Sequence, residues 1–260
     1  MSAAVVGLLA SLPAAALHRP GSPLPTWPEL FAVEPTLAAF ARALELVELR
    51  QQLVNSLLEV LVAVPLSVLV ASWAGFAMAM LTRRARRVAL AATFVLLMVP
   101  ASALWVPRFV LFAQIGFTDT LAPLIAPALM GTTPFAVLLF YFSFRRIPRD
   151  LLDAARLEGM GAWAIWRRVA SPLVRPTTFA AAMLVFVAHW GNFVDALLYL
   201  ASPDVYTLPL GLRTLGTLAP TLTSVLFAGA VIATVPAVLA FAVMQRRFLQ
   251  ATRTAGWLGG

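Results

Sequence analysis

Long apolar runs constrain this chain more than any other feature of its sequence. Each is long enough to cross a bilayer and free of charge clusters, and five are clear, at about residues 53–81, 88–107, 121–143, 177–200 and 222–244. A hydrocarbon core of ~30 Å needs about 20 helical residues at ~1.5 Å each. With 61% hydrophobic and 12% charged residues, the chain also has too little polar surface to coat a soluble globule. The sequence therefore predicts an all-α, polytopic membrane helix bundle.

A sixth apolar run, residues 3–17, is shorter than the others. It would span only about 22 Å as a helix, and no basic residue precedes it, as a signal peptide would require. We therefore expect a short or truncated first transmembrane helix, about six spans in all, and a single transmembrane domain over residues 1–260. Interior prolines such as Pro65, Pro100 and Pro127 are expected to form kinks that neighbouring helices absorb.

The arginines predict the orientation of the spans. Counting residues 3–17 as the first span, fourteen arginines follow the second, fourth and sixth spans (53–81, 121–143 and 222–244). They are Arg83, Arg84, Arg86, Arg87, Arg145, Arg146, Arg149, Arg156, Arg167, Arg168, Arg175, Arg246, Arg247 and Arg253. Because cytoplasmic loops are enriched in basic residues, we expect this side and the C-terminus to be cytoplasmic. Segments 18–52 and 201–221 are then external. The first is proline-rich and then amphipathic, and both are expected to receive an extracytoplasmic partner.

Several residue types that carry chemistry are absent or rare. The chain has no lysine, which excludes a Walker A lysine and Schiff-base catalysis, and no cysteine, which excludes disulfides and thiolate ligands. Its two histidines, His18 and His189, cannot build a His-rich metal site. The net charge of +8 follows from topology and does not indicate nucleic-acid binding. We expect no catalytic, cofactor or metal site in this chain.

The segment between the fourth and fifth spans, about residues 145–176, carries the most specific motif. Its ordered positions are an acidic residue, two alanines, a glycine after three spacers, and an aliphatic-x-x-proline after nine more: Asp153, Ala154, Ala155, Gly159, Val169 and Pro172. Pro148 favours a helix start, Gly159 a left-handed turn, and Pro172 the end of a second helix. The pattern predicts a helix-turn-helix over residues 148–172.

This spacing resembles the cytoplasmic "EAA" loop of permease subunits in type I, binding-protein-dependent ABC importers. The resemblance implies that the loop docks into a partner ATPase, with Ala154 and Ala155 admitting a close approach. Asp153 stands where the family usually has glutamate, so its acidic arm is one methylene shorter. The alternative is an ordinary amphipathic helix in the headgroup layer, which Trp163 and Trp166 would also suit.

Other stretches resemble the carbohydrate-uptake branch of these permeases, typified by the second membrane subunit of the maltose importer. They are Leu53–Leu57, His189–Leu200, Tyr206–Leu212 and Gln245–Phe248. The resemblance implies a non-catalytic subunit of a bacterial inner-membrane importer for a sugar or related small solute. Its expected partners are a second permease in a heterodimer, two ATPase subunits that bind ATP and Mg, an extracytoplasmic solute-binding protein and membrane lipid. The alternatives are a non-sugar solute or a proton-coupled secondary transporter that uses His189 and Asp195.

Polar residues inside the apolar runs are candidates for a solute pathway. His189, Asn192 and Asp195 step by three along the fifth predicted span, with Trp190 beside them. Such a set could bond sugar hydroxyls and stack on a sugar ring, so the possible pathway residues are Trp190, Asn192, Asp195 and Asn55. The alternative is hydrogen bonding between helices. A Glu59 to Arg108 pair is also conceivable, as is simple snorkelling of Arg108 to the interface.

Overall fold

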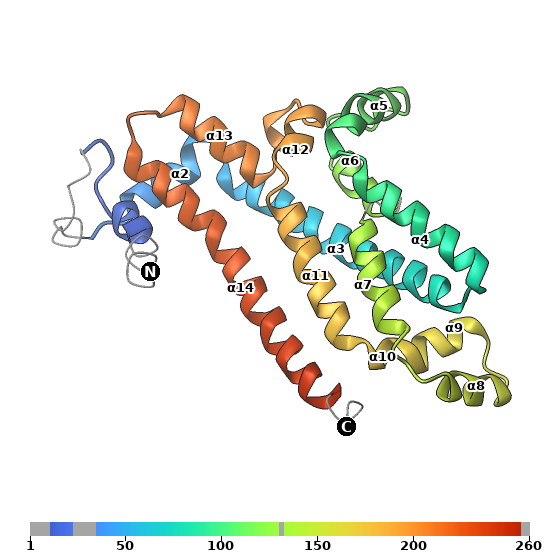
Figure 1. The fold of residues 1–260 in the computed structure, drawn as a ribbon. Helices are drawn as coiled ribbons and strands as arrows, with labels where there is room; N and C mark the ends of the chain where they lie inside the picture. The colour runs from blue at the N-terminus through green and yellow to red at the C-terminus, as the bar shows by residue number, and fades with distance from the viewer. Residues whose placement is uncertain (1–10, 23–34, 130–132, 256–260) are drawn as a thin grey trace. The chain divides into compact units, whose positions relative to one another are not determined.

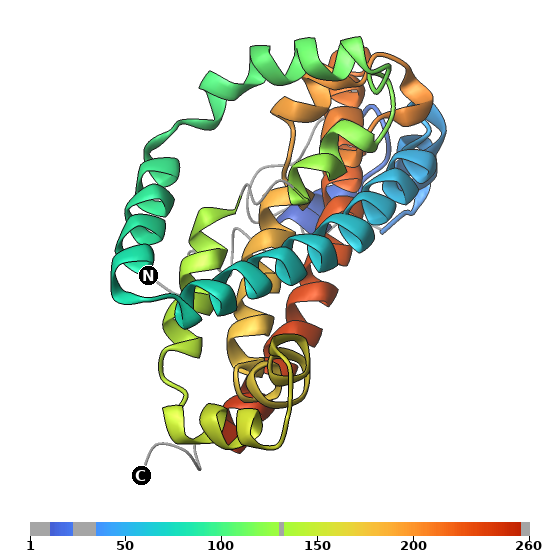
Figure 2. The same ribbon diagram turned by 90° about the vertical axis from the view of Figure 1, so that its right-hand side faces the viewer.

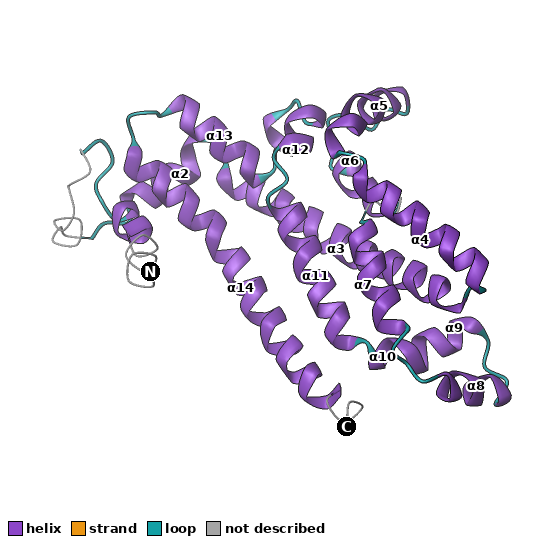
Figure 3. Ribbon diagram, viewed as in Figure 1, coloured by secondary structure: helices purple, strands orange, loops and turns teal. Residues whose placement is uncertain are grey.

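The computed structural model describes residues 11–22, 35–129 and 133–255. Regular secondary structure in these ranges is helical, without a strand, which confirms the all-α prediction (Figure 3). Tertiary contacts divide the chain into two compact units. Unit 1 comprises Met1–Leu58, Thr118–Leu121 and Trp190–Leu239, and unit 2 comprises Glu59–Phe117, Ala122–His189 and Ala240–Gly260.

Unit 1 contains the segments expected to be external. Its helices are α2 (Ala38–Leu46), the start of α3 (Leu49–Met80), α12 (Val194–Tyr199), η4 (Pro203–Val205), α13 (Leu208–Leu218) and most of α14 (Thr223–Ala255). Leu49, Leu208, Leu215 and Val225 form its fully buried centre. Helix α2 confirms the predicted amphipathic helix. Of the expected first span, residues 11–16 are helical, whereas residues 3–10 lie outside the described residues.

Unit 2 contains the rest of α3 and a series of shorter helices. These are α4 (Arg83–Met98), α5 (Ala101–Gln114), α6 (Ala122–Ile125), η2 (Ala126–Ala128), α7 (Pro134–Phe144), α8 (Arg149–Leu157), α9 (Ala162–Ala164), the π-helix η3 (Ile165–Ala170), α10 (Ser171–Leu173) and α11 (Arg175–Trp190). Figure 1 labels the α-helices in chain order. The motif segment thus becomes helices α8 to α10.

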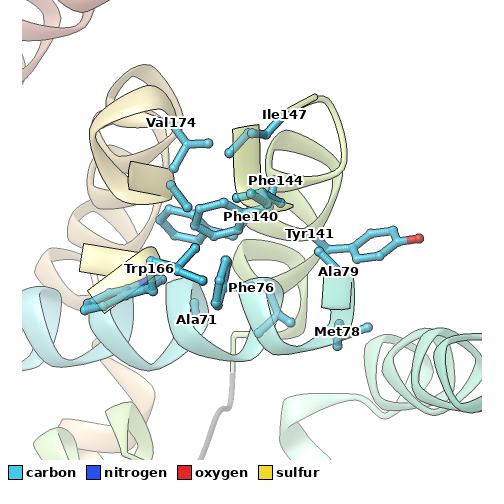
Figure 4. Packing of buried hydrophobic residues seen from close by; sticks show 14 of the residues in the cluster. Ala71, Phe76, Met78, Ala79, Phe140, Tyr141, Phe144, Ile147, Trp166 and Val174 are labelled. Carbon is cyan, nitrogen blue, oxygen red and sulfur yellow. The ribbon is translucent and has the colours of Figure 1, made fainter. Parts of the chain in front are cut away.

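An aromatic cluster holds α3 against α7 inside unit 2. The Phe76 and Phe144 ring centroids lie 5.4 Å apart, edge to face, and Phe140 stacks on Phe144 at 6.0 Å. Figure 4 shows Phe76 rising from α3 towards these rings, while Tyr141 points away. Gly75 makes the close approach possible, since a Cβ there would lie 2.6 Å from the Phe140 Cβ. This core is the base on which the motif segment rests.

The number of continuous spans is smaller than the sequence predicts. Within the described parts of the chain, two helices are long and apolar enough to cross a membrane, Leu49–Met80 and Thr223–Gln250, which agree with the predicted spans 53–81 and 222–244. Two further pairs are bent: α4 with α5 by 89°, visible in Figure 2, and Ala162–Leu173 with Arg175–Trp190 by 85°. Counting each bent pair as one span gives up to four spans among the described residues.

Three of the predicted spans are wrong as continuous helices. Span 88–107 breaks at Val99, which is extended (ψ 115°) because Pro100 disfavours helical geometry in the residue before it. Span 121–143 is divided into α6, η2 and α7, and α7 has 11 residues. Span 177–200 breaks at residues 191–193, between α11 and α12. The expected kink at Pro100 is therefore a full break, whereas Pro65 leaves α3 continuous.

Candidate functional site

The motif segment begins with α8 and the turn that ends it. The Met160 N–H donates to Ala155 O at 3.1 Å and the Gly159 N–H to Arg156 O at 2.9 Å, which is the hydrogen-bond pattern of a Schellman C-cap. Gly159 has φ +79°, a left-handed conformation that glycine adopts without steric cost. The predicted glycine turn is confirmed. Asp150 lies in the first turn of α8, where a carboxylate complements the helix dipole.

The second arm of the motif differs from its predicted form. A helix was expected over residues 162–170, ended by Pro172. Instead α9 leads into the π-helix η3, and α10 continues through Pro172 to Leu173. Pro172 therefore lies inside the continuous helical run Ala162–Leu173, which ends one residue after it. The chain leaves helical geometry at Val174 before α11 begins.

Tryptophans fasten this second arm to α3. Buried Trp166 donates from Nε1 to Ser72 Oγ at 3.1 Å, and its ring lies 4.8 Å from that of Trp163. Trp73 meets Trp163 edge to face at 5.2 Å and Trp166 at 6.0 Å. Trp166 is therefore covered by its own fold, whereas the amphipathic alternative would expose it to lipid headgroups. A movement of the motif segment must be transmitted directly to α3.

Helix α8 has two faces of different character. Leu152 and Ala155 are buried in the core of unit 2, at 4% and 6% exposure. On the other side Leu157 is 90% exposed, Leu151 is 43% exposed, and Ala154 is uncovered. The expectation that Ala155 presents itself to a partner is therefore wrong, because its methyl group packs inside its own fold. Ala154 occupies the outward position.

The remaining motif residues divide between the same two environments. Val169 packs against the core of unit 2, and Pro172 is partly buried, whereas Gly159 is exposed. Asp153 accepts a hydrogen bond from the Arg156 guanidinium at 2.6 Å. Arg156 also reaches Met80 Sδ at 3.4 Å, which ties α8 to the end of α3. The partner that the structure gives Asp153 is thus within its own helix.

The three polar residues expected on one helical face do not share a helix. His189 belongs to α11, Asn192 lies in the break, and Asp195 lies in the first turn of α12. The Asp195 N–H donates to Asn192 Oδ1 at 3.3 Å, and Asn192 Nδ2 donates to Asp195 Oδ2 at 3.2 Å. The prediction of a common face is wrong. Asn192 and Asp195 come together as a local cap of α12.

The other possible pathway residues also make intramolecular hydrogen bonds. Trp190 donates from Nε1 to Ala233 O on α14 at 3.2 Å. Asn55 is buried, and its Nδ2 donates to Asp204 O at 2.8 Å and to Tyr206 O at 3.0 Å. Asn55 therefore fastens the start of α3 to segment 201–221. The Leu208 N–H donates to Ser56 Oγ at 2.8 Å and extends the same contact.

A buried pair crosses unit 2 from α3 to α11. His189 Nδ1 lies 3.1 Å from Glu59 Oε1, with side-chain exposures of 12% and 2%. The sequence made Arg108 a conceivable partner for Glu59, but the pair found for this carboxylate is with His189. Both residues lie within apolar helices, where unpaired polar groups are costly. Their bond therefore holds α3 and α11 in register.

Asp119, in the loop between α5 and α6, binds the start of segment 201–221. Its carboxylate accepts hydrogen bonds from the Ser202 hydroxyl, the Ser202 N–H at 2.8 Å and the Ala201 N–H at 2.9 Å. These donors, the Ser202 hydroxyl first, lower the pKa of Asp119 below its usual value. The loop contact is therefore complete above the ordinary aspartate pKa, and it is lost as the pH falls through the lowered value.

No group of three or more His, Cys, Asp or Glu residues that could hold a metal ion occurs within residues 11–22, 35–129 and 133–255. The candidate functional site in unit 2 is instead the helical hairpin of α8 to α10. One face of this hairpin packs against the core of unit 2 and the other face is exposed.

Comparison with known proteins identifies the chain. Residues 63–254 match the family described as "Binding-protein-dependent transport system inner membrane component", and the chain belongs to this family. It is thus a membrane-spanning subunit of an ABC importer, as the resemblance of the motif implied. The matched range includes the whole of segment 145–176.

Several relatives share this membership. The arabinooligosaccharide transport permease AraQ of Halalkalibacterium halodurans is 34% identical over 79% of this chain and 73% of its own length. The lactose transport permease LacG of Rhizobium radiobacter is 32% identical over 75% of this chain and 71% of its own. In fold, the chain resembles a subunit of a bacterial importer of the polysaccharide alginate, with a TM-score of 0.73, 19% identity and 94% coverage of both chains.

The residues of α3 that anchor the motif segment are not among those predicted from the sequence. Ser72 and Trp73 lie in the second predicted span and were counted only as part of an apolar run. A serine followed by tryptophan, among small and aliphatic residues, is the signal that could have singled them out. Met80 carries no such signal, because a methionine at a helix end is an ordinary apolar residue.

Proposed function

We propose that the chain is one permease of an ATP-driven importer for a sugar or a related small solute. Residues 1–260 act as a single non-catalytic domain that pairs with a second permease and with two ATPase subunits, which hold ATP and Mg. A solute-binding protein delivers solute at segments 18–52 and 201–221. The relatives of the chain include arabinooligosaccharide, lactose and trehalose permeases, which supports a carbohydrate as the solute.

The outer face of α8 is the observation that carries this proposal. Leu157 is 90% exposed and lies near the exposed Ala154, so this face presents an apolar side chain that the rest of the described chain does not bury. A short helix with such a face suits a groove on a partner. Because Trp166 and Arg156 bind α3, a displacement of the hairpin by the ATPase moves α3 with it. Coupling is then a rigid-body movement between two states.

Ala154→Trp tests this docking. The indole would project from the outer face of α8 and obstruct the groove, so we expect at least tenfold less ATPase subunit to co-purify and an equal fall in solute uptake. The bulk enters a partner surface and not the core of the chain, so the yield of folded permease should be unchanged. The ATPase to use is the subunit that co-purifies with the wild-type chain from its native membranes.

Two variants serve as controls for that experiment. Ala41→Trp places the same residue on an uncovered alanine of α2, on the side expected to be external, and should keep wild-type ATPase binding. Ala155→Trp places it in the core and should lower the yield of folded chain. Wild-type ATPase binding by Ala154→Trp would contradict the docking surface.

Accessibility of single cysteines tests the proposed orientation. The chain has no native cysteine, so each introduced thiol is read without background. Both positions are exposed, and the proposed orientation puts them on opposite sides of the membrane. Ala162→Cys should therefore resist a membrane-impermeant thiol reagent in intact cells, and Thr221→Cys should react with it. After the cells are opened, both should react. Labelling of Ala162→Cys alone in intact cells would reverse the topology.

For the solute pathway, we propose Trp190, Asn192 and Asp195, at the break between α11 and α12. The break supports this assignment, since backbone outside a helix is tolerated at membrane depth only where protein or water satisfies it. For Asn55 we propose a supporting role, because its amide already bonds two backbone carbonyls. A gradient of pH that drives uptake by this chain alone, without ATP, would favour a secondary transporter over an ABC permease.

A further inference from the structure

A pocket lined by arginines lies between the end of α3, the start of α4, the end of α7 and the inner side of α8. Its volume is about 340 Å³. The charged residues that line it are Arg83, Arg86, Arg145, Arg149, Arg156 and Asp153. Five arginines against one carboxylate give a formal charge of +4. Such a concentration of positive charge around a cavity attracts an anion.

Most of this charge is not neutralised by the chain itself. Asp153 is paired with Arg156, which also contacts Met80. Among the described residues, no ion pair is formed by Arg83, Arg86, Arg145 or Arg149. Four guanidinium groups from three elements thus meet at one cavity without an acidic partner. Guanidinium groups bind phosphate oxygens in a bidentate manner, so the chemistry of the cavity favours a phosphate group.

The surface next to the pocket indicates where this phosphate comes from. Immediately after its arginines, α4 turns apolar and remains largely uncovered, with Val88 70%, Val95 60% and Met98 83% exposed. Residues 88–98 would extend about 16 Å at ~1.5 Å per residue, about half of a ~30 Å hydrocarbon core. A cationic pocket at one end of an apolar face as long as one leaflet matches the two parts of an anionic lipid.

The partner ATPase is the less suitable occupant. The pocket lies on the side of α8 that carries Leu152, which is buried, and Asp153. The uncovered anchor Leu157 does not line it. Docking through the outer face of α8 would therefore leave the pocket available to lipid.

We propose that this pocket binds the phosphate headgroup of an anionic phospholipid, with the acyl chains along α4. The choice of a lipid leaflet rests on the membrane orientation proposed above. Cytoplasmic leaflets are rich in anionic lipid, and basic pockets between membrane helices bind such headgroups. The lipid would fill the gap between the α3–α4 turn and α8, and so hold the motif segment at the membrane surface.

The test measures retention of phosphatidylglycerol by the purified full chain in neutral detergent, using native mass spectrometry over a lipid titration. Arg83→Gln with Arg86→Gln removes two charges from the pocket. Arg84→Gln with Arg87→Gln removes the same charge from the same helix, at positions that do not line the pocket. Each arginine near an anionic headgroup contributes about fivefold, so we expect about 30-fold weaker retention for the first pair and little change for the second.

Other outcomes would overturn the proposal. Equal losses in both pairs would indicate a diffuse charged surface. Glycerol phosphate or inorganic phosphate that binds as tightly as the lipid would assign the pocket to a soluble anion. Loss of ATPase binding with lipid retention intact would assign it to an acidic protein surface. If the first pair does not fold, Arg145→Gln with Arg149→Gln removes the same charge from the opposite wall and is read against Arg146→Gln.

This measurement is independent of the proposed transport function. The lipid titration uses the permease without ATPase, nucleotide or solute, so failure of coupling would leave the lipid result unaffected; ATPase binding by the same variants is measured separately. Conversely, wild-type ATPase binding together with no preference for phosphatidylglycerol would reject the lipid site and leave the importer assignment standing.

Discussion

Gly75→Ala is expected to cost about 3 kcal/mol of stability, because it forces α3 away from α7. The added methyl carbon would lie 2.6 Å from Phe140 Cβ, 2.8 Å from Tyr141 N and 2.9 Å from Val137 O. Two of these neighbours are backbone atoms, so no side-chain rotation can relieve the overlap, and overpacking of this kind costs about 1–3 kcal/mol, occasionally more. Thermal aggregation of the detergent-purified chain measures the effect.

Gly216→Ala is the matched control for this substitution. A Cβ at Gly216 of α13 meets only Leu226 Cδ2, at 3.8 Å, an ordinary contact. Alanine also favours a helix over glycine by about 1 kcal/mol, so this variant should be as stable as the wild type or slightly more so. Equal stability of both variants would show that α3 and α7 do not approach as closely as the structure has them.

His189→Leu is expected to lower the stability of the chain about as much as Gly75→Ala does. The cause here is the loss of an electrostatic partner and not steric overlap. The substitution leaves the buried Glu59 carboxyl without its partner on α11, and removal of one member of a buried pair costs about 3 kcal/mol or more. Replacing both residues removes the polar groups together. The double variant Glu59→Leu with His189→Leu should therefore recover much of the lost stability.

The measurement is again the thermal stability of the purified chain, compared across the two single variants and the double variant. Recovery in the double variant would assign the pair a structural role. If the double variant is as stable as the wild type but uptake is abolished, the pair also serves transport. Additive losses, with no recovery, would contradict a direct interaction between the two side chains.

Local chemistry made part of this fold predictable. Gly159 lies in the left-handed turn that its position between two helical stretches indicated, because a single residue decides that geometry. The long apolar runs at Leu49–Met80 and Thr223–Gln250 are helices, because a helix satisfies the backbone groups of a membrane segment within that segment. These features depend on the residues of one segment alone.

Features that depend on tertiary contacts were not predictable. Pro65 and Pro100 look alike in sequence, yet α3 continues through the first and the chain breaks at the second. Ala154 and Ala155 are chemically identical neighbours, but only the tertiary packing of unit 2 determines which of them is buried. The partner of Glu59 is His189, which is 130 residues later in the sequence, on α11. The residue pattern of a single helix cannot predict a contact with another helix.

The division of α8 into two faces has a consequence for how importers of this family can diversify. Leu152 and Ala155 are buried and contribute to the stability of the permease. Leu151, Ala154 and Leu157 are exposed and do not form part of that core. On the docking proposed above, substitutions at the second set would change the choice of ATPase without disturbing the core of unit 2. A permease could thus be transferred between ATPases, or come to share one with other importers, by exchange of three surface side chains on a single helix.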